Sequence, residues 1–295
     1  MSSNSGPLSK ETVAPAGGRA FPWPAIIWFA VLLILCYAPV LLRLINQWST
    51  DEDMGHGFFV PLVAGYMVWQ KRDRLLETAA APSWWGLAVI GYGAVQLYAA
   101  TLGAELFLAR TAFLISLIGV LLFLGGFPYL RVLAFPLFLL FFMVPIPAIV
   151  YNQITFPLQL FATRLAEHAL SAFGIPVLRE GNILELASQR LSVVEACSGI
   201  RSLLSLSFLS LVYAWFFDRK GWMRPVLLIA TVPIAIVANA SRVTVTGLLG
   251  EIKPELAEGF FHTASGWVIF MVALIILVVF HQVVNKVYRL SHAGK

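Results

Sequence analysis

Cys197 lies in the segment VVEACSGIRSLL, where an extended run ends and an apolar helix is predicted to begin near Ser198. The free backbone N–H groups and the dipole at a helix N-terminus favour anions, so a thiol at this position is biased towards the reactive thiolate. The N–H groups of Ser198 and Gly199 could also help to hold an oxyanion. Cys197 is therefore a candidate nucleophile, and the alternative is a structural membrane cysteine.

Two further residues could supply the remaining roles of acyl transfer. Arg242, in ANASRVTVTG, lies near the outer end of a predicted membrane span, where a guanidinium is costly and is a functional candidate by default. With Asn239 nearby we expect Arg242 to face a polar cavity, and the alternative is snorkelling towards the interface. His262, in FFHTASGW, is either a proton-transfer group or an incidental interfacial histidine. A thiolate nucleophile, an imidazole and an arginine that stabilises negative charge are the groups that acyl transfer needs.

Two other residues could support such a site. His56, in DEDMGHGFFVP, is predicted on the same outer face and is either substrate-facing or structural. Arg201 follows Cys197 by one helical turn, so it could hold the thiolate or line the same cavity.

The remaining histidines and cysteine suggest no site. Cys36 falls in the middle of the first span and is predicted to be a small hydrophobe. His168, His281 and His292 are predicted to be interfacial or solvated. No pair of these side chains has zinc-site spacing, so we predict neither a metal nor a cofactor.

The composition indicates the environment that must position these residues. The chain is 59% hydrophobic and 12% charged, and apolar stretches long enough to cross a bilayer recur between short polar breaks. We therefore predict an all-α polytopic membrane protein, with one membrane domain at residues 21–288. About eight transmembrane helices are expected, at residues 24–45, 58–70, 84–103, 106–127, 132–150, 199–217, 225–248 and 265–285.

The distribution of charge predicts the orientation. With the N-terminus inside, the inner segments hold 12 of the 20 Lys and Arg residues, the outer segments hold five, and Arg110, Arg201 and Arg242 lie within spans. The positive-inside rule then puts both termini in the cytoplasm. It also places Cys197, Arg242 and His262 near one outer face, although the rule made no use of their identities. The net charge of +5 follows from this topology and does not indicate nucleic-acid binding.

Three of the segments outside the predicted spans lie at residues 1–20, 151–198 and 289–295. Residues 1–20 are polar and are predicted to be a disordered cytoplasmic tail, and residues 289–295 form a short cytoplasmic tail. In the outer segment 151–198, polar residues share one helical face of ITFPLQLFATRLAEHALSAF, which predicts an amphipathic helix at the outer interface. The following residues predict a small β-hairpin, with a turn at Gly181 and Asn182, before the sixth span.

Together, VVEACSGIRSLL, ANASRVTVTG, HTASGW and the upstream DEDMGHGFFVPLVAGYMVWQKRDRL closely resemble the exosortase/archaeosortase family of bacterial and archaeal membrane enzymes. The resemblance implies an eight-helix inner-membrane cysteine protease or transpeptidase whose active site faces the periplasm. It implies that Cys197 is the nucleophile, Arg242 the oxyanion stabiliser and His262 the general acid and base.

The same resemblance implies the partners. The substrates would be secreted proteins with a C-terminal tripartite signal: a short motif such as Pro-Glu-Pro, a membrane helix and a basic cluster. Some family members carry a further C-terminal companion domain, and here we expect a separate protein to supply its function.

Two other functions stay open from the sequence. The first is a transporter or an assembly factor for exported polysaccharide, in which Arg242 and His262 line a substrate path. The second is a membrane acyltransferase that uses His262 alone. Both predict that Cys197 is dispensable.

Overall fold

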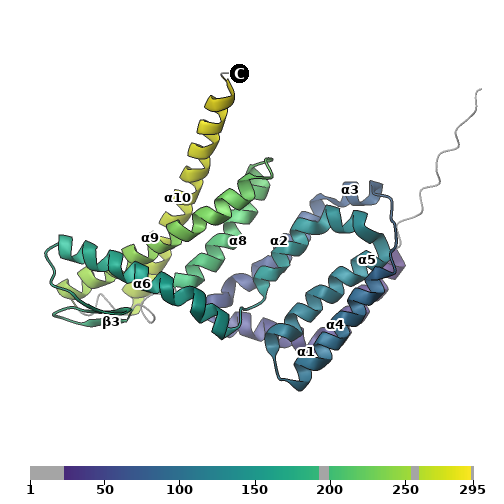
Figure 1. Cartoon of the computed structure of the whole chain (residues 1–295), viewed down its shortest axis with the longest axis horizontal. Coiled ribbons are helices and arrows are strands. Elements are labelled where there is room, and N and C mark those ends of the chain that lie inside the picture. Colours follow the sequence, from purple (N-terminus) through teal and green to yellow (C-terminus); the bar gives the residue numbers. More distant parts are fainter. Residues whose placement is uncertain (1–22, 193–198, 254–258, 294–295) are drawn as a thin grey trace, which may run out of the picture.

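The computed structural model describes residues 23–192, 199–253 and 259–293. Within these ranges the chain is mostly helical, with a small sheet between α6 and α8 (Figure 1). The elements are α1 (Trp23–Thr50), η1 (Glu52–Phe58), α2 (Phe59–Gln70), α3 (Arg72–Glu77), α4 (Trp85–Leu102), α5 (Leu106–Leu139), η2 (Leu140–Met143), α6 (Ala148–Ala172), β1 (Leu178–Glu180), β2 (Ile183–Glu185), β3 (Arg190–Ser192), α8 (Gly199–Phe217), α9 (Met223–Ile252) and α10 (Gly259–Ala293).

Five helices of the described residues are long and apolar enough to cross a membrane. They are Pro24–Thr50, Trp85–Leu102, Leu106–Met143, Met223–Ile252 and Ala264–His292, and a shorter apolar helix covers Leu203–Phe217. Large apolar side chains are exposed on them, which suits contact with lipid. The predicted count of eight spans is not reached by this criterion, because α2 has only 12 residues, two predicted spans are joined in α5, and α8 contributes only the shorter helix Leu203–Phe217.

The element α5 covers two of the predicted spans and is kinked between them. Gly126 has φ 74° and ψ −167°, so the helix is kinked there into two arms. A Cβ at this position would overlap the carbonyl of Ala81, so both the backbone angle and the close approach require glycine. The second arm ends at Met143 rather than at residue 150 as predicted, because Pro145 and Pro147 follow and α6 begins at Ala148.

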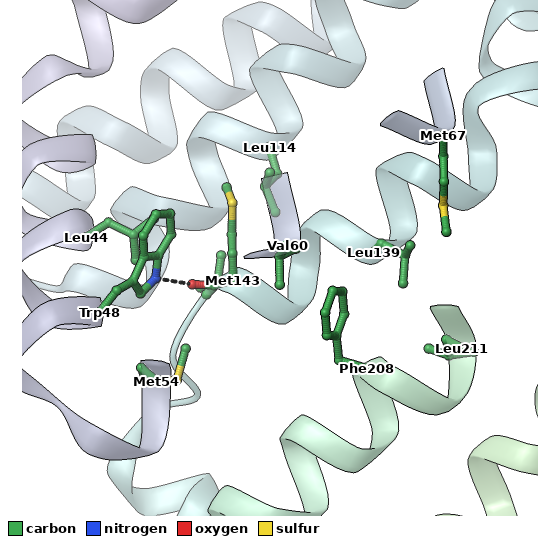
Figure 2. Close-up of a cluster of buried hydrophobic side chains, with 11 residues drawn as sticks. Leu44, Trp48, Met54, Val60, Met67, Leu114, Leu139, Met143, Phe208 and Leu211 are labelled. Carbon is green, nitrogen blue, oxygen red and sulfur yellow. Dashed lines mark hydrogen bonds between the residues drawn. The ribbon is translucent and has the colours of Figure 1, made fainter. Parts of the chain in front are cut away.

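One face of α8 packs against the N-terminal half of the chain. Phe208 and Leu211 of α8 enter a buried cluster with side chains of α1, η1, α2, α5 and η2 and the residue after η2, namely Leu44, Trp48, Met54, Val60, Met67, Leu114, Leu139, Met143 and Val144 (Figure 2). The indole N–H of Trp48 donates a 3.0 Å hydrogen bond to the carbonyl of Met143, which ties α1 to η2. The cluster therefore joins α8 to α1, α2 and α5 and to the two short helices η1 and η2.

A second contact joins the same elements near the C-terminal end of α8. The rings of Phe135 and Trp215 stack with centroids 4.7 Å apart. Lys71 lies 4.4 Å from the Trp215 ring and Arg224 lies 4.6 Å from both rings, so two cations cover one aromatic pair.

The opposite face of α8 packs against α9 and α10. The core there is built from leucine, methionine and alanine side chains: Leu206, Ala214, Met223, Leu227, Ala235, Ala238, Ala273 and Leu277. The small alanines let the helices approach closely, as in many membrane bundles.

A buried polar network closes the end of this three-helix group. His281 of α10 is 5% exposed, and its Nε2 lies 3.0 Å from Oδ2 of Asp218, which follows α8. The Tyr213 hydroxyl lies 3.0 Å from His281 Nδ1, and Asn285 donates to the Asp218 carboxylate at 3.0 Å. Burial raises the pKa of Asp218, but hydrogen bonds from His281, the Lys220 amide and Asn285 leave that pKa below its ordinary value. The prediction that His281 is interfacial or solvated is wrong.

This network predicts a stability effect. Asp218→Asn is expected to lower the unfolding free energy in detergent by about 1–3 kcal/mol, because a buried acceptor loses its charge. Since the folded-state pKa is depressed, the contribution of Asp218 is present above pH 3.8 and is lost as pH falls through the lower folded-state pKa. Thermal unfolding measured as a function of pH gives both the loss of stability and its pH dependence. The control Asp73→Asn changes an exposed carboxylate and is expected to stay within about 0.5 kcal/mol; equal effects of the two substitutions would contradict this assignment.

The sheet is fixed against α6 and α9. Where the sequence predicts one hairpin, β1, β2 and β3 form a three-stranded antiparallel sheet in sequence order, with Leu184 opposite Leu191. Leu184, Leu186 and Leu191 pack with Ala166 and Leu170 of α6 and Val243 of α9.

The loop between β2 and β3 adds a polar anchor to the end of α9. Ser188 donates from its hydroxyl to Glu251 at 2.6 Å and from its amide at 3.2 Å. Gln189 Nε2 also donates to the carbonyl of Thr246 at 3.5 Å. The strand that leads towards the cysteine segment is thereby tied to the helix that carries Arg242.

Candidate functional site

Three helices meet at the end of the molecule where the sheet lies. Figure 1 shows α8 and α10 beginning, and α9 ending, beside α6 and the sheet. The residues singled out from the sequence belong to these ends: Gly199 and Arg201 to the first turn of α8, Asn239 and Arg242 to α9, and His262 to the first turn of α10. Cys197 and Ser198 lie outside the described residues.

Arg242 is the candidate catalytic side chain that the structure describes. Its guanidinium lies against Gly266 of α10: a Cβ on that glycine would be 3.0 Å from Cζ, 3.1 Å from Nη2 and 3.3 Å from Nη1. The missing side chain at Gly266 therefore makes room for the arginine. His262 precedes Gly266 by four residues, which is one helical turn, so the Arg242 guanidinium lies one turn from the His262 position on α10.

The helix that carries Arg242 is fixed on its other sides. Val243 and Gly247, directly after it and one turn on, pack on α6 and the sheet, with Gly247 against Leu170. Thr244 is buried and donates to the carbonyl of Ala240 at 2.8 Å, within the helix. The position of the guanidinium is thus set by packing on both sides of α9.

Asn239 lies one turn before Arg242 and lines a narrow crevice between α6, α8 and α9. Thr155 and Gln159 of α6 and Leu203 of α8 line the same crevice, whose volume of about 20 Å³ suits a single water molecule. Asn239 is 9% exposed. The lining is mostly apolar, and Asn239 adds one of its three polar side chains together with Thr155 and Gln159; α6 was not expected to contribute to it.

His56 is held between the two halves of the chain. Its Nε2 lies 3.2 Å from the carbonyl of Phe142, and its Nδ1 lies 3.4 Å from the hydroxyl of Ser205 on α8. The geometry fits a neutral ring that donates from Nε2 and accepts at Nδ1. Ser205 follows Arg201 by one turn, so His56 is bonded to α8 at the turn after the Arg201 position.

Sequence reasoning missed several residues that arrange the site. Gly266 and Ser205 are small residues within apolar helical runs, and nothing in the pattern marks Ser205. The signal for Gly266 was its place one turn after His262, in a segment already singled out. Among the described residues, no group of three or more His, Cys, Asp or Glu side chains could hold a metal ion.

Comparison with known proteins identifies the family. A sequence profile described as transmembrane exosortase matches residues 48–279, which is most of the chain. The chain therefore belongs to the transmembrane exosortase family and is a multi-pass membrane protein. No curated protein and no solved structure matches it.

The contact between the Arg242 guanidinium and Gly266 predicts how a larger side chain at position 266 would change activity. Gly266→Val is expected to displace the guanidinium and to lower the activity proposed below by roughly 10- to 100-fold, because misplacement by about 1 Å has this effect in active sites. The rate of substrate cleavage by purified protein measures it. The matched control Gly91→Val changes a helical glycine with no atom within 4 Å of its Cβ position, and full activity is expected. Full activity of both variants would show that the contact has no role.

Proposed function

We propose that this exosortase-family protein is a membrane cysteine protease or transpeptidase that cleaves the C-terminal sorting signal of secreted proteins. Cys197 is the nucleophile, Arg242 stabilises the oxyanion and His262 transfers protons. Ser198, Gly199, Arg201, Asn239 and His56 support the site or contact the substrate. The observation that carries the proposal is the Arg242 guanidinium packed against Gly266, one turn from His262, in a chain that belongs to this family.

The proposed reaction has two halves. The Cys197 thiolate attacks the carbonyl carbon of the scissile peptide bond, and the negative charge that develops on its oxygen is held by Arg242. Collapse of this intermediate breaks the C–N bond, and the leaving amine takes a proton from His262. The resulting thioester is attacked by water or by an acceptor amine or hydroxyl, which gives its proton to His262 and regenerates the thiolate.

The helix arrangement suits a substrate that is itself anchored in the membrane. The described spans expose apolar side chains along their length, so a substrate helix can approach sideways through lipid. The recognition motif, of the Pro-Glu-Pro type, would then reach the end where α8 and α10 begin. With both termini in the cytoplasm, that end faces the periplasm of a bacterial inner membrane.

A cysteine substitution tests the proposal. Cys197→Ala, expressed beside a tagged secreted protein with such a C-terminal signal, is expected to leave the substrate at full length, because loss of a nucleophile lowers turnover by about 10³-fold or more. The size of the tagged protein measures cleavage. Cys36→Ala changes the exposed cysteine of α1 and is the control with normal processing. Normal processing by Cys197→Ala would favour the transporter, the assembly factor or the histidine-only acyltransferase.

Two substitutions of Arg242 separate the contribution of its positive charge from that of its bidentate guanidinium geometry. Arg242→Gln is expected to lower the cleavage rate by about 10²- to 10³-fold, as for loss of an oxyanion donor, and Arg242→Lys is expected to recover only part of that loss. Single-turnover rates with purified protein measure both variants. Cleavage at the wild-type rate by Arg242→Gln would remove Arg242 from the mechanism.

A further inference from the structure

A second cavity, open to the surroundings and lined by both polar and apolar side chains, lies between α1 and α5, two helices that pack side by side. It occupies the C-terminal end of α1 and the N-terminal end of α5, the ends that the charge distribution places outside. The cavity has a volume of about 490 Å³ and is lined by Arg43, Asn46, Gln47 and Thr50 from α1 and by Arg110 from α5. This volume falls in the range of small-molecule sites.

Arg110 is the feature that calls for a ligand. It is 5% exposed, its Nε is buried without a hydrogen-bond partner, and it makes no ion pair with any described residue. A buried guanidinium in a membrane helix is costly unless an anion or several acceptors surround it. Arg43, at the exposed rim of the same cavity, also makes no hydrogen bond or ion pair with the described part of the chain.

Two carboxylates lie near the arginines in sequence, Glu105 five residues before Arg110 and Asp51 eight residues after Arg43, and each accepts a hydrogen bond from its own segment. Glu105 accepts a 2.7 Å hydrogen bond from the amide of Leu108 and so caps its own helix. Asp51 accepts from Gln47 Nε2 at 3.2 Å. Among the described residues neither forms an ion pair with Arg110.

The surroundings indicate the kind of anion. Arg110 lies four residues, or about 6 Å, inside the N-terminal end of α5, which is close to the membrane surface if that end faces water. The apolar wall of the cavity comes from Leu42 and Leu106, which are 66% and 41% exposed and face the surroundings of the bundle. Acyl chains can pass these leucines while a headgroup sits between the arginines. Two guanidinium groups suit the oxygens of a phosphate.

We infer that the cavity between α1 and α5 binds a phosphate group, presented by the headgroup of an anionic lipid, through Arg110 and Arg43. The inference does not rest on the proposed peptidase activity, and its test uses no cleavage assay.

Binding is tested with the purified full chain in neutral detergent. Thermal unfolding is measured against added phosphatidylglycerol, dioleoylglycerol and inorganic phosphate. Phosphatidylglycerol is expected to raise the melting temperature of the wild type, and uncharged dioleoylglycerol is not. Arg110→Gln is expected to weaken the apparent lipid affinity by about tenfold or more. The matched control Arg164→Gln changes an exposed arginine of α6 and should respond as the wild type does.

The same titrations decide whether the bound phosphate belongs to a lipid or is free in solution, and whether the two arginines bind it at all. An Arg110-dependent response to inorganic phosphate alone would assign the site to free phosphate, and a response to phosphatidylglycerol alone assigns it to lipid. Without lipid, Arg110→Gln is expected to unfold no earlier than the wild type, because it loses no protein partner. Should that variant fail to fold, Arg43→Gln at the rim is expected to weaken lipid binding instead. Equal lipid responses of the wild type and the folded arginine variants would overturn the inference.

Discussion

The packing of α8 between two groups of helices is the constraint on which the rest of the structure depends. Phe208, Leu211 and Trp215 face the N-terminal helices, while Leu206 and Ala214 face α9 and α10. Both faces are apolar, and in lipid no hydrophobic driving force brings apolar helix faces together, so close fit and a few polar contacts must hold the helix in place. His56 bonds α8 near one end, and the stacked pair of Phe135 and Trp215, with Lys71 and Arg224, holds the other.

Since α8 begins at Gly199, its placement also decides where the cysteine segment is presented. The other side of the candidate site is formed by α9. Its Arg242 contacts α10 in the space left by the missing side chain of Gly266. The candidate site is thus built from the ends of helices that are rigid elsewhere. This arrangement suits preorganised charge stabilisation, in which donors are fixed before charge develops.

The sequence predicted the class of the fold and the elements that carry the site, because apolar runs and positive loops report directly on a bilayer. It could not predict the kink at Gly126, where a positive φ depends on the neighbouring carbonyl of Ala81. It predicted that His281 is interfacial or solvated, because a histidine near a helix end has the same local sequence pattern whether or not an aspartate from another segment reaches it. Arg110 was recognised as lying within a span, but its burial is a tertiary property that no local pattern shows.

The anchor between the sheet and α9 has a consequence for how this chain tolerates changes in length. Ser188 and Gln189 fix the approach to β3 from one side, and the packing of α8 fixes Gly199 from the other. An insertion or deletion between Ser192 and Gly199 would change the number of residues that connect these two fixed elements. Length variation should instead collect at exposed turns such as the one between β1 and β2 at Gly181, where no atom lies within 4 Å of a Cβ position.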